Sequence, residues 1–271
     1  MAGVTLSKSE GIARLVFDHP PINLFTFELF VETADLIQEV AVDDSVRVLV
    51  LSSANPEFFI AHFDVEAILR FPTGSPPATE LNPYHEMCET LRTMPKATIA
   101  VIEGRTGGGG SELALSCDMR FAALPSAGRA GAVFNQPEVA LGIIPGGSGT
   151  QRLARLMGRS RALEAVLGCD DVDAGLAERW GWVNRSLPTD ELWPFVERLA
   201  RRIASFPAHA VAAAKASVVR AEKEVREDLL AEGNAFSATL GGPGAREAME
   251  KFLADGGQTR DGELRLGSLF D

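Results

Sequence analysis

The chain has 271 residues, and 46% of them are hydrophobic, which is enough for one large core or two small ones. Its formal net charge of −11 argues against nucleic-acid binding, because that function needs a basic face for the phosphates. The three cysteines include no C-x-x-C pair, so neither a disulfide framework nor a zinc site is expected, and a reducing cytoplasm is the predicted compartment.

Strand-like and helix-like segments alternate in the first half of the chain. Two β-prone runs, Val4–Ser7 and Ile12–Phe17, flank the turn residues 8–11 and predict a hairpin. Apolar residues recur at helical spacing over 27–41, which predicts an amphipathic helix. Further apolar runs suit strands covered on both faces, as in a parallel sheet surrounded by helices. These runs are Val46–Leu51, Thr98–Ile102 and Met119–Ala123.

Helical patterns dominate after about residue 150. The predicted helices cover 149–157, 160–167, 173–180, 190–205, 208–222, 224–238 and 244–254. One obvious loop, FPTGSPPATELNP at 71–83, precedes them, because its prolines and glycine disfavour regular structure. No apolar run approaches the roughly 20 residues that span a bilayer, and the N-terminus lacks the layout of a secretory signal. The sequence therefore predicts a soluble, cytoplasmic α/β protein with a helical C-terminal portion.

Four consecutive glycines, Gly107–Gly110, stand in the stretch TGGGGSELALSCD. The spacing from Gly104 to Ser111 fits a P-loop, but Gly110 occupies the position of the lysine that binds the β- and γ-phosphates. The dinucleotide fingerprint also fails, because Glu112 stands where a third glycine is required. A flexible linker is disfavoured because the glycines lie between two apolar runs.

A strand, a tight glycine turn and a helix remain as the interpretation of this stretch. The N–H groups of Gly108–Gly110 have no intrahelical partners at the start of the helix, and the helix dipole adds partial positive charge there. Glycines allow an acyl group to approach this backbone closely. The arrangement is that of an oxyanion hole, with Glu112 expected on the first helical turn beside it.

A second glutamate, Glu138, follows Pro137 and precedes the apolar run VALGII, so it is poorly placed for ordinary solvent exposure. Glu112 and Glu138 could hold one water between them, with one carboxyl group acting as base and the other as acid. Solvated surface glutamates are the alternative interpretation, because the chain contains 37 acidic residues and most of them must face water.

Other catalytic motifs are absent or incomplete. The segment His85–Glu89 (HEMCE) imitates a zincin helix but has only one histidine, and Gly146–Thr150 fails the G-x-S-x-G pattern at its last position. The four histidines show no ligand spacing, so no metal is expected.

Two long segments carry a family resemblance: EGRTGGGGSELALSCDMRFAA and FNQPEVALGIIPGGSGTQRLARLMG. They resemble the paired signatures of the enoyl-CoA hydratase/isomerase (crotonase) family, G-x-x-x-G-G-G-x-E-L-x-x-x-C-D and Q-P-E-x-x-x-G-x-x-P-G-x-G-G-T-Q-R-L. The second segment departs only at Ser148, where the family usually has glycine. Pro21–Asn23, Phe59–Asp64 and the segment GLAERWGWVN also match, so the likeness covers most of the chain.

This resemblance implies a crotonase-like α/β fold, a spiral of ββα turns. It assigns 1–200 to the spiral core with the active site and 201–271 to a helical region that packs a homotrimer or a dimer of trimers. It implies an acyl-CoA thioester as the substrate and a place in fatty acid metabolism. No cofactor is expected, because coenzyme A enters as part of the substrate.

The family's oxyanion hole maps onto the backbone N–H groups of Phe63 and Gly109, and the two glutamates of its hydratases map onto Glu112 and Glu138. The resemblance implies that Glu138 protonates Cα and Glu112 activates water, and keeping both favours water addition to a 2-enoyl-CoA. Further substrate contacts are expected from Ala61, His62, Asp64 and Gly108. The 71–83 loop and the helix that carries Tyr84, Met87 and Leu91 are expected to shape the acyl pocket.

The oxyanion loop departs from the family pattern, because AHFD at 61–64 replaces A-G-A-D or S-G-A-D. A histidine in place of glycine restricts φ, and Phe63 narrows the pocket. His62 has two interpretations, a loop residue near the pocket mouth, which is favoured, or an additional catalytic group.

Acidic residues replace lysines that hydratases often carry for the coenzyme A phosphates, namely Glu57, Glu66 and Asp255. Arg70 and Arg260 are candidates to serve instead. The alternatives to a hydratase are an enoyl-CoA isomerase, an acyl-CoA thioester hydrolase of the same fold, and a non-catalytic crotonase-like subunit.

Overall fold

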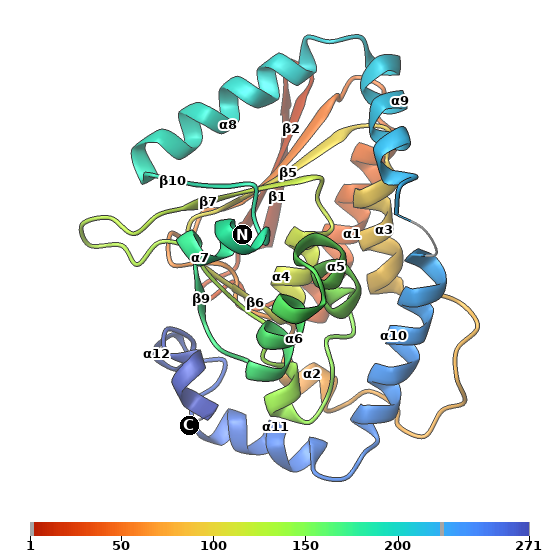
Figure 1. Ribbon diagram of the computed structural model, residues 1–271, viewed down its shortest axis with the longest axis vertical. Coiled ribbons are helices and arrows are strands. Elements are labelled where there is room, and N and C mark those ends of the chain that lie inside the picture. The colour runs from red at the N-terminus through yellow and green to blue at the C-terminus, as the bar shows by residue number, and fades with distance from the viewer. Residues whose placement is uncertain (1–2, 223–224, 271) are drawn as a thin grey trace.

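Two β-sheets form the centre of the computed structural model, which describes residues 3–222 and 225–270 (Figure 1). The larger sheet has six strands in the order β1-β2-β3-β5-β7-β10. Its first two strands, β1 (Gly3–Ser9) and β2 (Ile12–Asp18), are antiparallel. They turn at Glu10 and Gly11, with φ values of 52° and 75°. The predicted hairpin is confirmed, although residues 8 and 9 belong to the strand rather than to the turn.

The remaining strands of the larger sheet run parallel to β2. They are β3 (Val48–Ser53), β5 (Ala97–Ile102), β7 (Met119–Ala123) and β10 (Arg185–Leu187). Side chains alternate between the two faces: Val48 and Val50 pack with helix α8 (Thr189–Ala204), whereas Leu49 and Leu51 pack into the opposite core. Burial on both faces explains why β3 and β5 are largely apolar, as the sequence predicted, whereas β10 is partly exposed and was not predicted.

A smaller sheet has the order β4-β6-β8-β9. Its strands are only two or three residues long, too short to show a periodic pattern, and the sequence did not predict them. They are β4 (Phe58–Ile60), β6 (Arg105–Gly107), β8 (Val133–Asn135) and β9 (Val172–Asp173).

The two sheets are joined by a repeated strand–strand–helix unit. Each of three strands of the larger sheet is followed by a strand of the smaller sheet and then by a helix. These helices are α2 (Val65–Ile68), α4 (Gly108–Leu115) and the 3₁₀ helix η1 (Glu138–Leu141). The chain therefore forms the spiral of ββα turns that the resemblance implied.

The predicted helices are present within a few residues of their expected bounds. They are α1 (Phe27–Val42), α5 (Gly149–Met157), α6 (Arg159–Gly168), α7 (Ala174–Trp180), α8, α9 (Ala208–Val219), α10 (Val225–Leu240) and α11 (Ala245–Ala254). The predicted helix 208–222 ends earlier, at Val219, and position 224 of the next lies outside the described residues. Helix α3 (Pro83–Thr93) follows the predicted loop, and α12 (Arg260–Glu263) and η2 (Leu266–Phe270) end the described chain.

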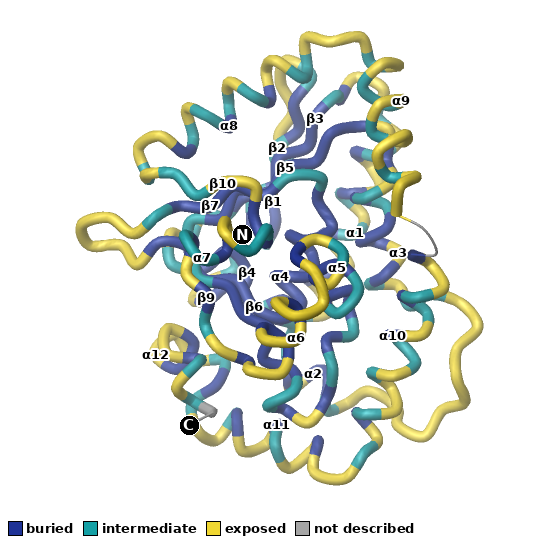
Figure 2. Tube along the Cα trace, viewed as in Figure 1, coloured by how far each residue is buried: buried dark blue, intermediate teal, exposed yellow. Residues whose placement is uncertain are grey.

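The C-terminal helices surround the two sheets (Figure 1). Helix α8 packs on one face of the larger sheet and α9 lies beside α3, whereas α10, α11 and α12 follow one another toward the end of the molecule opposite α8. Figure 2 shows burial concentrated in the strands and α4, whereas α9 has no buried residue. No helix within the described residues is long and apolar enough to cross a membrane. The division into 1–200 and 201–271 stays a prediction.

Candidate active site

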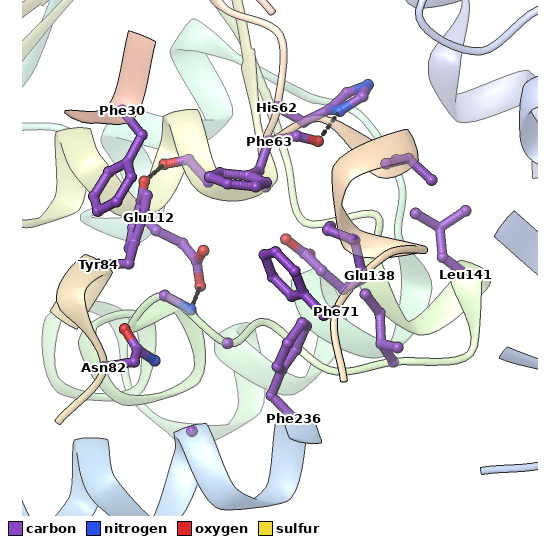
Figure 3. A pocket seen from close by; sticks show the side chains of 18 of the residues that line it. Phe30, His62, Phe63, Phe71, Asn82, Tyr84, Glu112, Glu138, Leu141 and Phe236 are labelled. Carbon is purple, nitrogen blue, oxygen red and sulfur yellow. Dashed lines mark hydrogen bonds between the residues drawn. The ribbon is translucent and has the colours of Figure 1, made fainter. Parts of the chain in front are cut away.

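A cavity of about 290 Å³ lies between the turn before α4, the helices α2, α3 and η1, and helix α10 (Figure 3). Its volume is close to the lower end of the range typical of small-molecule pockets. Aromatic rings supply much of the wall, from Phe27, Phe30, Phe63, Phe71, Tyr84, Phe236 and Phe252. Two carboxyl groups, of Glu112 and Glu138, also line it. The cavity is thus mostly apolar with a few convergent polar groups, the composition expected of a ligand site.

The structure brings six of the eight sequence-predicted site residues to this cavity. They are His62, Phe63, Gly108, Gly109, Glu112 and Glu138. Ala61 and Asp64 lie outside the lining: the Ala61 carbonyl accepts from Gly107 N at 2.8 Å, and Asp64 caps α2 by accepting from Glu66 N at 2.9 Å. From the expected acyl-pocket region, Tyr84 lines the cavity, as do Phe71 and Asn82 of the loop before it, whereas Met87 and Leu91 lie in the core.

Glu112 is the fifth residue of α4 and therefore lies beyond the first turn, contrary to the sequence prediction. Its Oε1 accepts hydrogen bonds from Gly147 N at 2.9 Å and from Gly149 N at 2.8 Å. A Cβ atom at Gly147 would lie 2.4 Å from Glu112 Oε2, so only glycine leaves room for the carboxylate. Burial, together with the negative charges of Glu138 and Glu232, raises the pKa of Glu112 well above its usual range.

Glu138 begins η1, directly after Pro137, and is buried as the sequence predicted. Gln136 Nε2 lies 3.4 and 3.3 Å from its two oxygens, which makes both contacts long. Burial raises the pKa of Glu138 to about 7. Gly108, with φ of 44°, faces this carboxyl group, and a Cβ atom there would lie 2.8 Å from Glu138 Oε1. The glycines before α4 therefore make space for both carboxyl groups.

The two expected oxyanion donors, Phe63 N–H and Gly109 N–H, lie on adjacent segments of backbone. Phe63 forms a parallel bridge with Phe25, in which Phe25 N donates to His62 O at 2.9 Å and Asp64 N donates to Phe25 O at 3.1 Å. In such a bridge the middle residue directs its own N–H to the opposite side. Within the described residues, neither Phe63 N nor Gly109 N donates to another protein group.

Gly109 keeps the space in front of Phe63 open. A Cβ atom at Gly109 would lie 3.2 Å from Phe63 Cβ and 3.5 Å from Phe63 N. The Tyr84 hydroxyl donates to Gly109 O at 2.5 Å and so holds the backbone of the glycine turn in place. Tyr84 itself packs in an aromatic cluster with Phe25 and Phe30.

His62 is buried rather than placed at an exposed pocket mouth, since its exposed fraction is 4%. Its imidazole points away from the space between the two carboxyl groups (Figure 3). Burial alone would lower the pKa of His62, but the charge and hydrogen bond of Glu263 and the Phe63 carbonyl raise it to about 8.

Glu232 on α10 is a neighbour that sequence reasoning missed. This buried carboxylate accepts from Thr150 N at 2.9 Å and Gln151 N at 3.3 Å at the start of α5, and lies 3.2 Å from His85 Nε2. Nothing in its local sequence distinguishes it from the other acidic residues of the helix. Its position depends on how α10 packs against α5.

Three of the five charged residues considered for the coenzyme A phosphates, Glu57, Asp255 and Arg260, form ion pairs. Arg260 Nε donates to Glu57 Oε2 at 2.8 Å, so these two residues neutralise each other. Lys251 pairs with Asp255 at 2.5 Å. Glu66 and Arg70 are exposed. Arg260 therefore reaches a phosphate only if its bond to Glu57 is exchanged.

Two adjacent N–H donors and two buried carboxyl groups around an apolar cavity define a class of site. Such a site stabilises negative charge on a carbonyl oxygen while side chains beside it move protons, which is the chemistry of an enzyme that acts on an acyl group.

Comparisons with known proteins assign the family. The family model for enoyl-CoA hydratase/isomerase matches residues 7–257. A crotonyl-CoA hydratase of Syntrophomonas wolfei is 32% identical, covering 92% of this chain and 94% of that protein. A short-chain-enoyl-CoA hydratase of Clostridium acetobutylicum is 29% identical over the same shares. The crystal structure of a provisionally assigned enoyl-CoA hydratase from Streptomyces avermitilis superposes with a TM-score of 0.88 at 39% identity, covering 98% of this chain and 96% of that one.

The chain belongs to the enoyl-CoA hydratase/isomerase family. This confirms the resemblance drawn from the two sequence motifs, the crotonase-like fold and the prediction of an enzyme of this class.

Proposed function

We propose that the protein is an enoyl-CoA hydratase that adds water across the double bond of a 2-enoyl-CoA thioester. The observation that carries this proposal is that Glu112 and Glu138 line one buried cavity together with the Phe63 and Gly109 donors. Water addition needs one group to take a proton from water and another to give a proton to carbon. Two carboxyl groups on one cavity wall supply both.

The reaction uses the two N–H donors and the two carboxyl groups of the cavity together. The Phe63 and Gly109 N–H groups donate hydrogen bonds to the thioester oxygen and stabilise the enolate that forms when water adds to Cβ. Glu112 removes a proton from the water as its oxygen bonds to Cβ, and Glu138 delivers a proton to Cα. One proton enters and one leaves the carboxyl pair, so the atoms of one water molecule are added to the substrate.

The hydrogen bonds support this division of roles. Burial favours the neutral form of both carboxyl groups, and two negative charges in one cavity repel each other. When the pair shares one proton, the two short N–H bonds to Glu112 favour its ionised form, whereas Glu138 receives only the long contacts from Gln136. These hydrogen bonds favour placing the shared proton on Glu138, where Cα needs it, whereas burial, which raises the pKa of Glu112 well above its usual range, opposes that placement.

The alternatives use the same cavity differently. An isomerase moves a proton between carbons and needs only one of the two carboxyl groups, and a thioester hydrolase needs water at the carbonyl carbon rather than at Cβ. A non-catalytic subunit would have no requirement for a cavity of about 290 Å³ between the carboxyl groups and the donors. The retained pair of carboxyl groups favours the hydratase.

We also propose that the protein works in the cytoplasm on fatty acyl groups, as a homotrimer or a dimer of trimers, and needs no cofactor beyond the coenzyme A that its substrate carries. The exposed apolar surface of helix α9 supports the proposal of an oligomer, because its sequence AHAVAAAKASVV has no buried residue and Val218 is 74% exposed. Light scattering on the purified protein measures the number of copies.

Hydration of crotonyl-CoA, followed as loss of absorbance of the enoyl thioester, tests the proposal. We expect Glu112→Gln and Glu138→Gln each to lower kcat by about 100-fold or more, because each removes one proton-transfer group. Glu247→Gln, an exposed change on α11, is the matched control and keeps the wild-type rate. Full activity in both site variants would refute the mechanism. Failure of calorimetry to detect binding of any acyl-CoA would favour the non-catalytic subunit.

A further inference from the structure

The oxyanion loop, residues 61–65, is held by a distant part of the chain. His62 Nε2 lies 3.0 Å from Glu263 Oε1, and His62 Nδ1 lies 2.8 Å from Phe63 O. The two side chains are 5% and 0% exposed, so this ion pair is buried. Both groups that face the imidazole nitrogens are acceptors, so both nitrogens donate only when the ring is the imidazolium ion. A ring bound on both nitrogens has no free proton site for a substrate.

Gln258 adds two more contacts to the same loop. Its Oε1 accepts from Val65 N at 2.7 Å, and its Nε2 donates to Asp64 Oδ1 at 3.0 Å. Gln258 N in turn donates to Glu263 Oε1 at 2.7 Å. The Glu263 side chain is thus bonded to the Gln258 backbone as well as to the loop. We call residues 258–263 the C-terminal clasp.

The clasp and strand-like residue Phe25 hold the loop from two directions. Phe25 bonds the backbone of His62 and Asp64, and the clasp bonds the side chains of the same two residues. Phe63 lies between them and directs its N–H toward the cavity. The direction of this donor therefore depends on contacts that the substrate does not touch.

The charges around His62 fit an imidazolium ion held in place. Glu263 on α12 and Glu138 on η1 are the acidic groups that act on it, and the Phe252 ring of α11 lies 5.7 Å away. Burial alone would raise the pKa of Glu263, but the charge and hydrogen bond of His62, the bond from Gln258 N and the charge of Arg105 on β6 keep it below its usual value. Both partners are then charged at neutral pH.

We propose that His62 and Glu263 are positioning residues that aim the Phe63 N–H at the thioester oxygen, so that the C-terminal clasp completes the oxyanion hole. The proposal rests on the proposed function for the role of that N–H. It also explains why histidine replaces the glycine of the family pattern: the loop is fixed here by a buried ion pair.

Two kinds of measurement test the clasp. In the first, kcat and KM for crotonyl-CoA are compared between the wild type, Glu263→Ala, His62→Ala and the double variant. We expect each single variant to lower kcat by about 10- to 100-fold while KM changes less than about threefold. The reason is that a displaced Phe63 N–H loses its hydrogen bond to the thioester oxygen mainly in the transition state. The double variant should lose no more than the worse single variant, since the two residues act as one unit. Glu263→Gln, which keeps an acceptor for His62, should recover part of the rate.

The second measurement is hydrogen–deuterium exchange of residues 60–66, which needs no substrate. In Glu263→Ala, the amide hydrogens of this segment should exchange about tenfold faster than in the wild type, because local opening of the loop becomes easier. Glu197→Ala is the matched control: it removes a carboxylate that pairs with Arg14 at 2.7 Å, between α8 and β2. This control should keep both the rate and the loop protection.

Thermal unfolding of each variant identifies a temperature at which all of them are folded, and the assays are run at that temperature. A lower rate then reflects a misplaced donor and not an unfolded protein. Wild-type kcat and unchanged loop exchange in Glu263→Ala would overturn the proposal, as would equal losses in Glu197→Ala. If the wild type itself hydrates no enoyl-CoA, the proposed function fails, but the exchange measurement still decides whether the clasp holds the loop.

Discussion

The two proposed oxyanion donors, the N–H groups of Gly109 and Phe63, lie on opposite walls of the cavity, the glycine turn and the oxyanion loop, and these walls are held in place by opposite means. The glycine turn, Gly107–Gly110, is fixed by the absence of side chains: a Cβ atom at Gly110 would lie 2.4 Å from Ile60 O, and one at Gly107 would lie 2.2 Å from Asn135 Oδ1. The oxyanion loop is fixed by the presence of side chains, those of His62 and its partners in the C-terminal clasp. One donor depends on close backbone packing and the other on long-range polar contacts.

This difference predicts different responses to substitution. Close packing fails when volume is added, because neighbouring backbone atoms cannot move aside cheaply. A polar clasp fails when a partner is removed, because a buried charge is then left without compensation. The glycine turn should therefore be sensitive to the smallest added group, whereas the loop should respond to loss of charge and to pH.

The largest effect is expected from Gly110→Ala. The added methyl group would meet Ile60 O and also lie 2.7 Å from Ile60 Cβ, so α4 must move away from β4. We expect unfolding free energy to fall by about 2–3 kcal/mol and hydration to slow by about 100-fold, because both Gly109 and Glu112 move with the helix. Chemical denaturation and the crotonyl-CoA assay measure the two quantities.

Gly168→Ala at the end of α6 is the control for Gly110→Ala, because no atom lies within 4 Å of its added Cβ. It should leave both the rate and the stability near wild type. If Gly110→Ala behaves like this control, then close packing does not fix the glycine wall, and the contrast between the walls disappears.

The same contrast decides which parts of the molecule the sequence revealed. The glycine turn, Glu112 and Glu138 belong to two continuous motifs, and the resemblance of these motifs to the family signatures placed both glutamates in one expected site. The central strands β3 and β5 of the larger sheet were predicted because burial on both faces makes them largely apolar. In both cases the determining interactions leave a local pattern.

Long-range contacts leave no such pattern. The strands of the smaller sheet contain too few residues for alternation, and the pairing of His62 with Glu263 joins residues 201 positions apart. Glu232 was missed for the same reason, since 82 positions separate it from Thr150. The sequence showed that the oxyanion loop is unusual. The partner of its histidine, Glu263, could not be predicted, because only the fold brings the C-terminal clasp next to the loop.

A smaller effect is expected from Glu232→Gln, which asks whether the glycine side also depends on a distant side chain. Glu232 binds the N–H groups of Thr150 and Gln151, directly after the Gly147 and Gly149 N–H groups that hold Glu112. Its negative charge is one cause of the raised pKa of Glu112. The neutral variant should lower that pKa and shift the acid limb of kcat/KM to lower pH, with a loss of rate of about tenfold or less.

Glu227→Gln, an exposed change on the same helix, is the control for charge removal alone and should leave the pH profile in place. An unshifted profile in Glu232→Gln would show that the charge of Glu232 does not reach Glu112. The glycine wall would then be independent of distant side chains, which would sharpen its contrast with the loop.

The last prediction concerns the loop and is a dependence of stability on pH. The pKa of His62 is raised from 6.5 to about 8 in the folded protein, so its contribution is fully present below pH 6.5 and is lost as the pH rises through about 8. A shift of this size corresponds to about 2 kcal/mol of unfolding free energy. Denaturation of the wild type and of His62→Gln at pH 6 and pH 9 measures it, since the other titrating groups are common to both proteins. The wild type should lose about 2 kcal/mol more than the variant between these pH values. Equal losses would mean that the buried pair with Glu263 does not stabilise the fold as an ion pair, and the two walls would then differ in packing but not in electrostatics.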